Sequence, residues 1–136
     1  MADTLDVNLV TPRGVVAHQS ADGLTAPGEL GEFELLPGHV PLLTALRPGV
    51  LTIGDKTRAR YAVSAGYLRC DTSGAVEVLV EQAVAAGEVD LEAARADLRA
   101  AEAEVVKWGD KPTDGEWQIL QNRVAWAQAR LDVNKT

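Results

Sequence analysis

Short runs in which hydrophobic and polar residues alternate occupy the first two thirds of the chain. The alternation is clear over residues 5–9, 58–64 and 76–80. A period of two places the apolar residues on one face of a β-strand. Turn-forming residues separate these runs at the intervals of an all-β sandwich or barrel, at 11–14, 22–23, 54–57 and 71–74. We therefore expect an antiparallel β-sandwich over residues 1–87, in which Ala59, Tyr61 and Val63 share one face.

The period changes after Gly87. Apolar residues then recur at spacings of three and four, which is a helical pattern. The two apolar seams are Leu91, Ala94, Leu98, Ala101, Val105 and Trp108, and then Trp117, Leu120, Val124, Ala127 and Leu131. Asp90 is placed to cap the first helix, and Thr113 with Glu116 fits a capping box for the second. Residues 88–136 are therefore predicted to form an antiparallel αα-hairpin.

Alanine fills several seam positions, so the two helices have little apolar surface to bury between them. Such a hairpin is expected to pack on something else, either the sandwich or a partner. Two interpretations stay open at this point. The hairpin is packed permanently on the sandwich, or it exchanges between two docking places that differ little in free energy.

Charge and hydropathy restrict the partners. The 136 residues include 13 Lys and Arg against 20 Asp and Glu, which gives a net charge of −7. Nucleic acids and anionic membranes attract basic proteins, so neither is an expected partner. No apolar run reaches the roughly 18 residues of a membrane span, and the acidic N-terminus does not resemble a signal peptide. We expect a cytosolic protein with no direct lipid insertion, which reaches a membrane only through a partner.

Catalytic signatures are scarce. The sequence contains no glycine-rich phosphate loop and no nucleophile elbow, so we expect neither an enzyme nor a required cofactor. One alternative stays open, a metal- or thiol-dependent enzyme that uses His18, His39 and Cys70. No Cys/His pair in the chain has the local spacing of metal ligands.

The most distinctive segment covers residues 31–49 and reads GEFELLPGHVPLLTALRPG. It combines a strand, a Pro-Gly turn that presents His39, an apolar stretch and a second Pro-Gly turn. Together with VSAGYL at 63–68, this segment resembles the epsilon subunit of the rotary ATP synthase, which is called delta in mitochondria. The resemblance extends over essentially the whole chain. Glu34 and Ala65 stand where the family carries glycine, so we expect a local backbone that does not need a conformation reserved for glycine.

The resemblance implies a non-catalytic rotor subunit in the central stalk of a proton-translocating ATP synthase. In that family the sandwich joins the gamma subunit to the c-ring. Glu32 matches the family glutamate on the c-ring side, and His39 matches the family histidine near gamma. Leu42 and Leu43 would support the same edge, and their alternative role is plain core. The resemblance also implies a peripheral position, through the complex, at the cytoplasmic face of the bacterial inner membrane.

The resemblance further implies that the hairpin inhibits ATP hydrolysis by extending along gamma toward the beta and alpha subunits. Arg123, Arg130 and Lys135 are the candidate contacts with acidic helical segments of beta. The chain from Glu116 onward has three basic residues against two acidic ones, which suits an acidic partner. The alternative for each cation is a solubilising surface charge.

A possible regulatory ligand comes from the same resemblance. Some bacterial members bind ATP at the hairpin through an (Ile/Leu)-Asp-x-x-Arg-Ala motif, and residues 91–96 read LEAARA. The implied nucleotide contacts are Leu91, Glu92, Arg95 and Ala96, with Arg99 as a further phosphate contact. Glu92 replaces the family aspartate, and an acid and an arginine three residues apart also form an ordinary intrahelical pair. An ATP-sensing module, whose hairpin closes on nucleotide, is therefore the alternative function.

Overall fold

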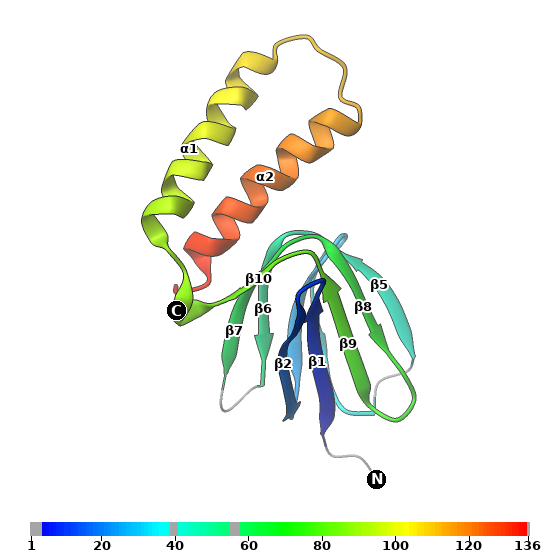
Figure 1. Cartoon of the computed structure of the whole chain (residues 1–136). Coiled ribbons are helices and arrows are strands. Elements are labelled where there is room, and N and C mark those ends of the chain that lie inside the picture. Colours follow the sequence, from blue (N-terminus) through cyan, green and yellow to red (C-terminus); the bar gives the residue numbers. More distant parts are fainter. Residues whose placement is uncertain (1–3, 39–40, 55–57, 136) are drawn as a thin grey trace.

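The computed structural model describes residues 4–38, 41–54 and 58–135. Ten β-strands are followed by two α-helices, so the expected class of a β-sandwich with a C-terminal αα-hairpin is confirmed (Figure 1). The strands are β1 (Leu5–Thr11), β2 (Gly14–Ala21), β3 (Leu24–Gly28), β4 (Gly31–Leu35), β5 (Leu42–Leu46), β6 (Gly49–Ile53), β7 (Ala59–Val63), β8 (Gly66–Cys70), β9 (Ala75–Val80) and β10 (Ala83–Ala85). A short 3-10 turn, η1 (Ala86–Glu88), leads to α1 (Leu91–Trp108) and α2 (Gly115–Asp132).

The strands follow one path, β10-β7-β6-β3-β5-β8-β9-β1-β2, with β4 paired to β3. The path bends between β3 and β5, which are joined through a single residue pair, Gly28 with Leu46. We call β5, β8, β9, β1 and β2 the front sheet, and β10, β7, β6, β3 and β4 the back sheet. Among the described pairs all are antiparallel except β1 with β9, which is parallel.

One hydrophobic core lies between the two sheets. Alternate residues of each strand point into it, as their period of two requires. Leu5 and Leu68 of the front sheet and Leu51 and Ile53 of the back sheet are fully buried there. The predicted face of β7 is confirmed, since Val63 belongs to the core and Ala59 and Tyr61 pack against it.

At two positions this chain carries another residue where the family has glycine, and neither position has a strained backbone. No described residue other than glycine has a positive φ, so Glu34 and Ala65 both adopt ordinary backbone conformations. Gly66 does require glycine, but for a different reason. Its φ angle is accessible to any residue, whereas the space around it leaves no room for a side chain. A Cβ on Gly66 would overlap the backbone carbonyl oxygen of Leu79 on the neighbouring strand.

The helix caps agree with the sequence at the first helix and differ at the second. Asp90 caps α1, and its Oδ1 accepts a hydrogen bond from the amide of Ala93 at 3.1 Å. The capping box predicted from Thr113 is wrong, because α2 is capped by Asp114, whose Oδ1 accepts from the Glu116 amide at 3.0 Å. Asp114 is one residue closer to the helix, and its negative charge also suits the helix N-terminus.

The seams predicted for the hairpin are confirmed. The only residues of α1 that are not exposed are its six seam residues, and all five seam residues of α2 are at least partly buried. At the far end of the hairpin, the rings of Trp108 and Trp117 pack with their centroids 5.1 Å apart. The rest of the seam is narrow, because Ala94, Ala101 and Ala127 are among its buried members.

The hairpin is docked on the sandwich through the C-terminal part of α2 (Figure 1). A small second core consists of Ala62 on β7 and of Ala129 and Val133 at the end of α2. Val50 and Trp126 pack against it, as do Ala86 and Val89 of the connecting segment. The turn between the helices points away from the sandwich. The C-terminal end of α2 and the connecting segment together therefore hold the hairpin on the sandwich.

Candidate binding surfaces

An apolar row crosses the outer face of the front sheet. The strand register places Ala45, Tyr67, Leu79, Val10 and Val15 side by side on five consecutive strands. Tyr67 is 58% exposed, Leu79 is 43% exposed and Val15 is 64% exposed. Single exposed apolar side chains are common, but a row of them on adjacent strands is typical of an interaction surface.

Polar side-chain pairs border this row on one side. Arg69 of β8 forms an ion pair with Glu77 of β9, two residues along from the row. A second pair joins β1 and β2, where His18 Nε2 lies 2.9 Å from Asp6 Oδ1. On the row itself, a 380 Å³ cavity is lined by Val10, Thr11, Pro12, Ala65, Gly66, Leu79, Val80 and Glu81. The front sheet thus has an apolar centre with a polar border, which is the usual anatomy of a protein interface.

The two leucines predicted for the interface lie on opposite faces of β5. Leu43 points outward on the same face as the apolar row and is 70% exposed. Leu42 packs against the core of the sandwich. The position of Leu43 is therefore compatible with the predicted interface role. Leu42 has the alternative role, that of a core residue.

The turn between β3 and β4 presents a second exposed surface. Leu30 lies at this turn and is fully exposed. Glu32 follows on β4 and points to the outer face of the back sheet, where it lines a 450 Å³ groove with Arg47 and Arg60, among others. His39, the other residue predicted for this region, lies outside the described residues.

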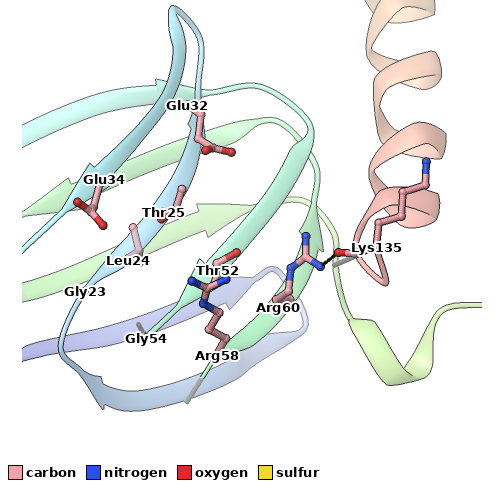
Figure 2. A pocket seen from close by; sticks show the side chains of 10 residues that line it. All are labelled: Gly23, Leu24, Thr25, Glu32, Glu34, Thr52, Gly54, Arg58, Arg60 and Lys135. Carbon is pink, nitrogen blue, oxygen red and sulfur yellow. Dashed lines mark hydrogen bonds between the residues drawn. The ribbon is translucent and has the colours of Figure 1, made fainter. Parts of the chain in front are cut away.

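A polar pocket of 530 Å³ lies on the outer face of the back sheet, beside the docked hairpin (Figure 2). Its floor is a cross-strand row of Glu34, Thr25, Thr52 and Arg60, on β4, β3, β6 and β7. Lys135 forms part of the wall, and Arg60 donates a hydrogen bond to its backbone carbonyl. The end of the hairpin therefore has a polar contact with the sheet in addition to its small apolar core.

The three cations predicted to contact an acidic partner all have acidic partners within the chain. Arg123 Nη1 lies 2.5 Å from Glu104 of α1, Arg130 Nη2 lies 2.7 Å from Asp97 of α1, and Lys135 Nζ lies 3.1 Å from Asp132.

Arg130 is the most enclosed of these cations. Only 14% of its side chain is exposed, and its guanidinium lies 5.2 Å from the ring centre of Trp126. Its Nε is buried without a hydrogen-bond partner. Arg130 thus joins the two helices to each other, whereas Arg123 and Lys135 remain on the surface.

The residues of the predicted nucleotide motif lie on different faces of α1. Leu91 belongs to the seam, whereas Glu92, Arg95, Ala96 and Arg99 are exposed. The two sandwich pockets next to the hairpin and the 460 Å³ pocket at its far end are lined by other residues. The sequence motif is present, but these residues do not form the walls of those cavities.

The residues of the metal or thiol alternative do not come together in the described part of the chain. Cys70 is buried in the core, and burial followed by the charge of Asp71 raises the pKa of its thiol. His18 points outward and pairs with Asp6. Within the described residues no group of three His, Cys, Asp or Glu side chains could hold a metal ion. No described helix is long and apolar enough to cross a membrane.

Sequence reasoning missed most of the apolar row. One signal was present, because Leu79 interrupts the polar side of β9 between Glu77 and Glu81. The other members could not be grouped from sequence, since they come from four other strands, whose order depends on the parallel pairing of β1 with β9. Leu30 was missed because a single leucine beside a turn carries no periodic signal.

These features define the class of protein. A compact sandwich presents an apolar row on one sheet and an exposed turn elsewhere, and it carries a lightly docked helical hairpin. That combination is typical of a module that docks on other proteins.

Comparisons with known proteins identify the family. Residues 4–86 match the family described as ATP synthase, Delta/Epsilon chain, beta-sandwich domain. An ATP synthase epsilon chain of Geobacter sulfurreducens is 40% identical over 134 residues, covering 98% of this chain and 95% of the relative. That of Citrifermentans bemidjiense is 41% identical over the same shares.

Solved structures share the fold. A chain of the Euglena gracilis mitochondrial ATP synthase structure, described as OSCP/F1/c-ring in rotational state 1, superposes with a TM-score of 0.77 at 20% identity, covering 97% of this chain and 81% of that chain. A chain of the central stalk/c-ring structure from Tetrahymena thermophila superposes with a TM-score of 0.61 at 15% identity, covering 96% of each. The chain belongs to the ATP synthase delta/epsilon chain family, as the resemblance at residues 31–49 and 63–68 predicted.

Proposed function

We propose that this chain is a non-catalytic central-stalk subunit that joins the gamma subunit to the c-ring of a bacterial ATP synthase. The observation that carries the proposal is the apolar row on the front sheet, because an exposed row of this kind needs a partner to cover it. Gamma is its partner. The exposed turn at Leu30, with Glu32 beside it, faces the c-ring. The subunit is peripheral at the cytoplasmic face of the membrane and is held there by the complex.

Introducing charge into the row tests the gamma contact. Tyr67→Asp combined with Leu79→Asp places two carboxylates where the row would be covered, and both side chains are exposed, so the free chain should fold normally. We expect the double variant to lose co-purification with gamma, since desolvating unpaired charges in an interface costs several kcal/mol. Val106→Asp, at an exposed position on α1, is the matched control and should co-purify. A double variant that binds gamma like the wild type would refute this surface.

The c-ring contact is tested separately. Leu30→Asp with Glu32→Ala changes the β3–β4 turn and leaves the apolar row intact. We expect gamma to bind normally, while ATP-driven proton pumping in membrane vesicles falls relative to ATP hydrolysis. Glu88→Ala removes an exposed acid elsewhere and should leave pumping unchanged. Full coupling in the turn variant would exclude this role.

We also propose that the hairpin inhibits ATP hydrolysis when it leaves the sandwich and contacts acidic segments of beta. Its small docking core and its surface cations support this. Arg123 suits the test better than Arg130, because reversing the enclosed Arg130 would disrupt the hairpin itself. Arg123→Glu should weaken inhibition, with an effect that decreases as salt rises.

A charge swap separates the two roles of Arg123. Arg123→Glu with Glu104→Arg restores the pair within the hairpin but not a contact with an acidic partner. Inhibition should therefore stay weak in the swapped variant. If the swap restores full inhibition, Arg123 acts only within the hairpin.

The ATP-sensing alternative has no supporting observation among the cavities of the hairpin region. Calorimetry of the free chain with Mg-ATP decides it. We expect no binding at micromolar nucleotide, and micromolar affinity would reinstate the alternative.

A further inference from the structure

Strand β2 (Gly14–Ala21) is the longest of the described strands, and it ends the sheet path. Among the described strands it pairs only with β1, so one side of its backbone has no strand partner (Figure 1). An open strand edge presents a row of backbone donors and acceptors that another strand can pair with. Natural proteins usually protect such edges.

Both open edges of the back sheet are protected. Strand β10 has only three residues, which offers little length for pairing. Strand β4 carries Glu32 and Glu34, whose charges discourage an incoming strand. Strand β2 reads GVVAHQSA and contains no proline, lysine, arginine, aspartate or glutamate.

A β-bulge protects only the beginning of β2. The register shifts between Leu9 and Val10, which leaves Val16 as the extra residue of β2. From Ala17 to Ala21 the strand runs in continuous register with β1. Five consecutive residues therefore form a regular edge without any of the usual protecting features.

The unprotected edge is continuous with the apolar row. Val15 is the last member of that row and lies on β2 itself, and its neighbour Val16 is 40% exposed. Apolar surface thus extends from the outer face of the front sheet to its edge. A partner lying on the row would reach the edge without crossing a charged residue of β2.

We propose that the β2 edge accepts an extended segment of the partner that covers the apolar row, which adds a strand beside Ala17–Ala21. This inference rests on the proposed function, in which that partner is gamma. Backbone hydrogen bonds would hold the segment, as in other complexes formed by strand addition. A second copy of this chain is the less suitable occupant, because pairing β2 with β2 would leave both apolar rows uncovered.

Two neighbouring prolines test the proposal. In an antiparallel pair, successive amides of a strand point alternately toward and away from its neighbour. Of Gln19→Pro and Ser20→Pro, one therefore removes an amide that bonds β1, and the other removes an amide that points to the open edge. The second kind is tolerated on an edge strand, so its free chain should melt like the wild type.

We expect weaker binding to gamma from the proline variant whose free chain keeps the wild-type melting temperature. That variant should bind gamma at least tenfold more weakly, because its proline removes a donor and obstructs the added strand. The other proline variant should melt at a lower temperature and serves as the control for loss of the β1 pairing. A stable proline variant that binds gamma with wild-type affinity would overturn the proposal.

Hydrogen exchange on the wild-type complex provides a second measurement. On binding gamma, alternate amides of residues 17–21 should gain at least tenfold protection relative to the free chain. Unchanged exchange there, with gamma bound, overturns the strand addition and leaves the proposed function intact. Failure of the wild type to bind gamma at all would instead refute the proposed function. Protection that depends on the concentration of the free chain would identify a second copy as the occupant.

Discussion

Docking of the hairpin on the sandwich depends on a contact small enough to be shifted by one substitution. Val133 closes the end of α2, is 1% exposed and packs with Ala62 and Ala129. Val133→Ala removes two methyl groups from this contact and leaves the inter-helix seam unchanged. The substitution should therefore move the equilibrium between the docked and undocked hairpin toward the undocked state.

The magnitude follows from the buried groups. Each buried methyl contributes about 0.8 kcal/mol, so two contribute about 1.6 kcal/mol, and an unfilled cavity raises the loss to about 2.5 kcal/mol. Since 1.4 kcal/mol corresponds to a factor of ten, the undocked population should increase roughly 15- to 60-fold. The polar contact between Arg60 and the Lys135 carbonyl is expected to persist in the docked state.

Thiol labelling measures the undocked population directly. Ala62 is fully buried beneath α2, so a cysteine introduced there by Ala62→Cys reacts only when the hairpin leaves. Its labelling rate in the free chain should rise by the same factor when Val133→Ala is added. The native Cys70 lies in the sandwich core and reports any general unfolding, so its labelling should stay unchanged.

A matched control removes the same groups from an exposed site. Val106 is 84% exposed on α1, and Val106→Ala should leave labelling at position 62 unchanged. Equal labelling rates for Val133→Ala and Val106→Ala would contradict a role of Val133 in docking. Faster labelling of Cys70 together with the introduced cysteine would contradict it as well.

Three further predictions concern stability. Hydrogen bonds from the Ser73 side chain and then the Ala75 amide lower the pKa of Asp71, so its carboxylate contributes stability that is lost as the pH falls through that lowered value. The melting temperature of Asp71→Asn should be below that of the wild type at pH 7. This difference in melting temperature should narrow as the pH falls below 3.8, the ordinary pKa of the carboxyl group. A difference that stays constant with pH would contradict the prediction. Gly66→Ala should lower the free energy of unfolding, measured with denaturant, by about 2–4 kcal/mol. Gly115→Ala has open space at its Cβ and should be neutral or stabilising. Equal effects of the two substitutions would contradict the close contact described at Gly66. A double-mutant cycle of Trp108→Ala and Trp117→Ala should give about 0.5–1.5 kcal/mol of coupling in thermal unfolding, and strict additivity would exclude the ring contact.

Local patterns predicted the helical part of the fold well. Spacings of three and four identify the seam residues of α1 because a helix converts sequence spacing directly into a face. The second buried face of α2, with Trp126 and Ala129, was not predicted. It contacts Val50 and Ala62, more than sixty residues earlier in the chain, and no local period records such a contact.

The sandwich shows the same limit. Alternation predicts which side of β1 or β9 is buried, but it does not reveal that these two strands are parallel neighbours. The apolar row from Tyr67 through Leu79 to Val10 exists only because of that pairing. Glu32 and His39 were found through a family motif, which reflects common ancestry. The apolar row has no such motif and follows only from the register of the strands.

We propose that the sandwich assembles with the rotor while the hairpin restrains hydrolysis. The most direct test compares ATP hydrolysis by the complex containing the whole chain with that of a complex containing residues 1–87. Co-purification with gamma in both cases establishes that each complex has assembled. We predict that the complex without the hairpin hydrolyses ATP several-fold faster at equal occupancy. Equal rates in the two assembled complexes would contradict this restraining role of the hairpin.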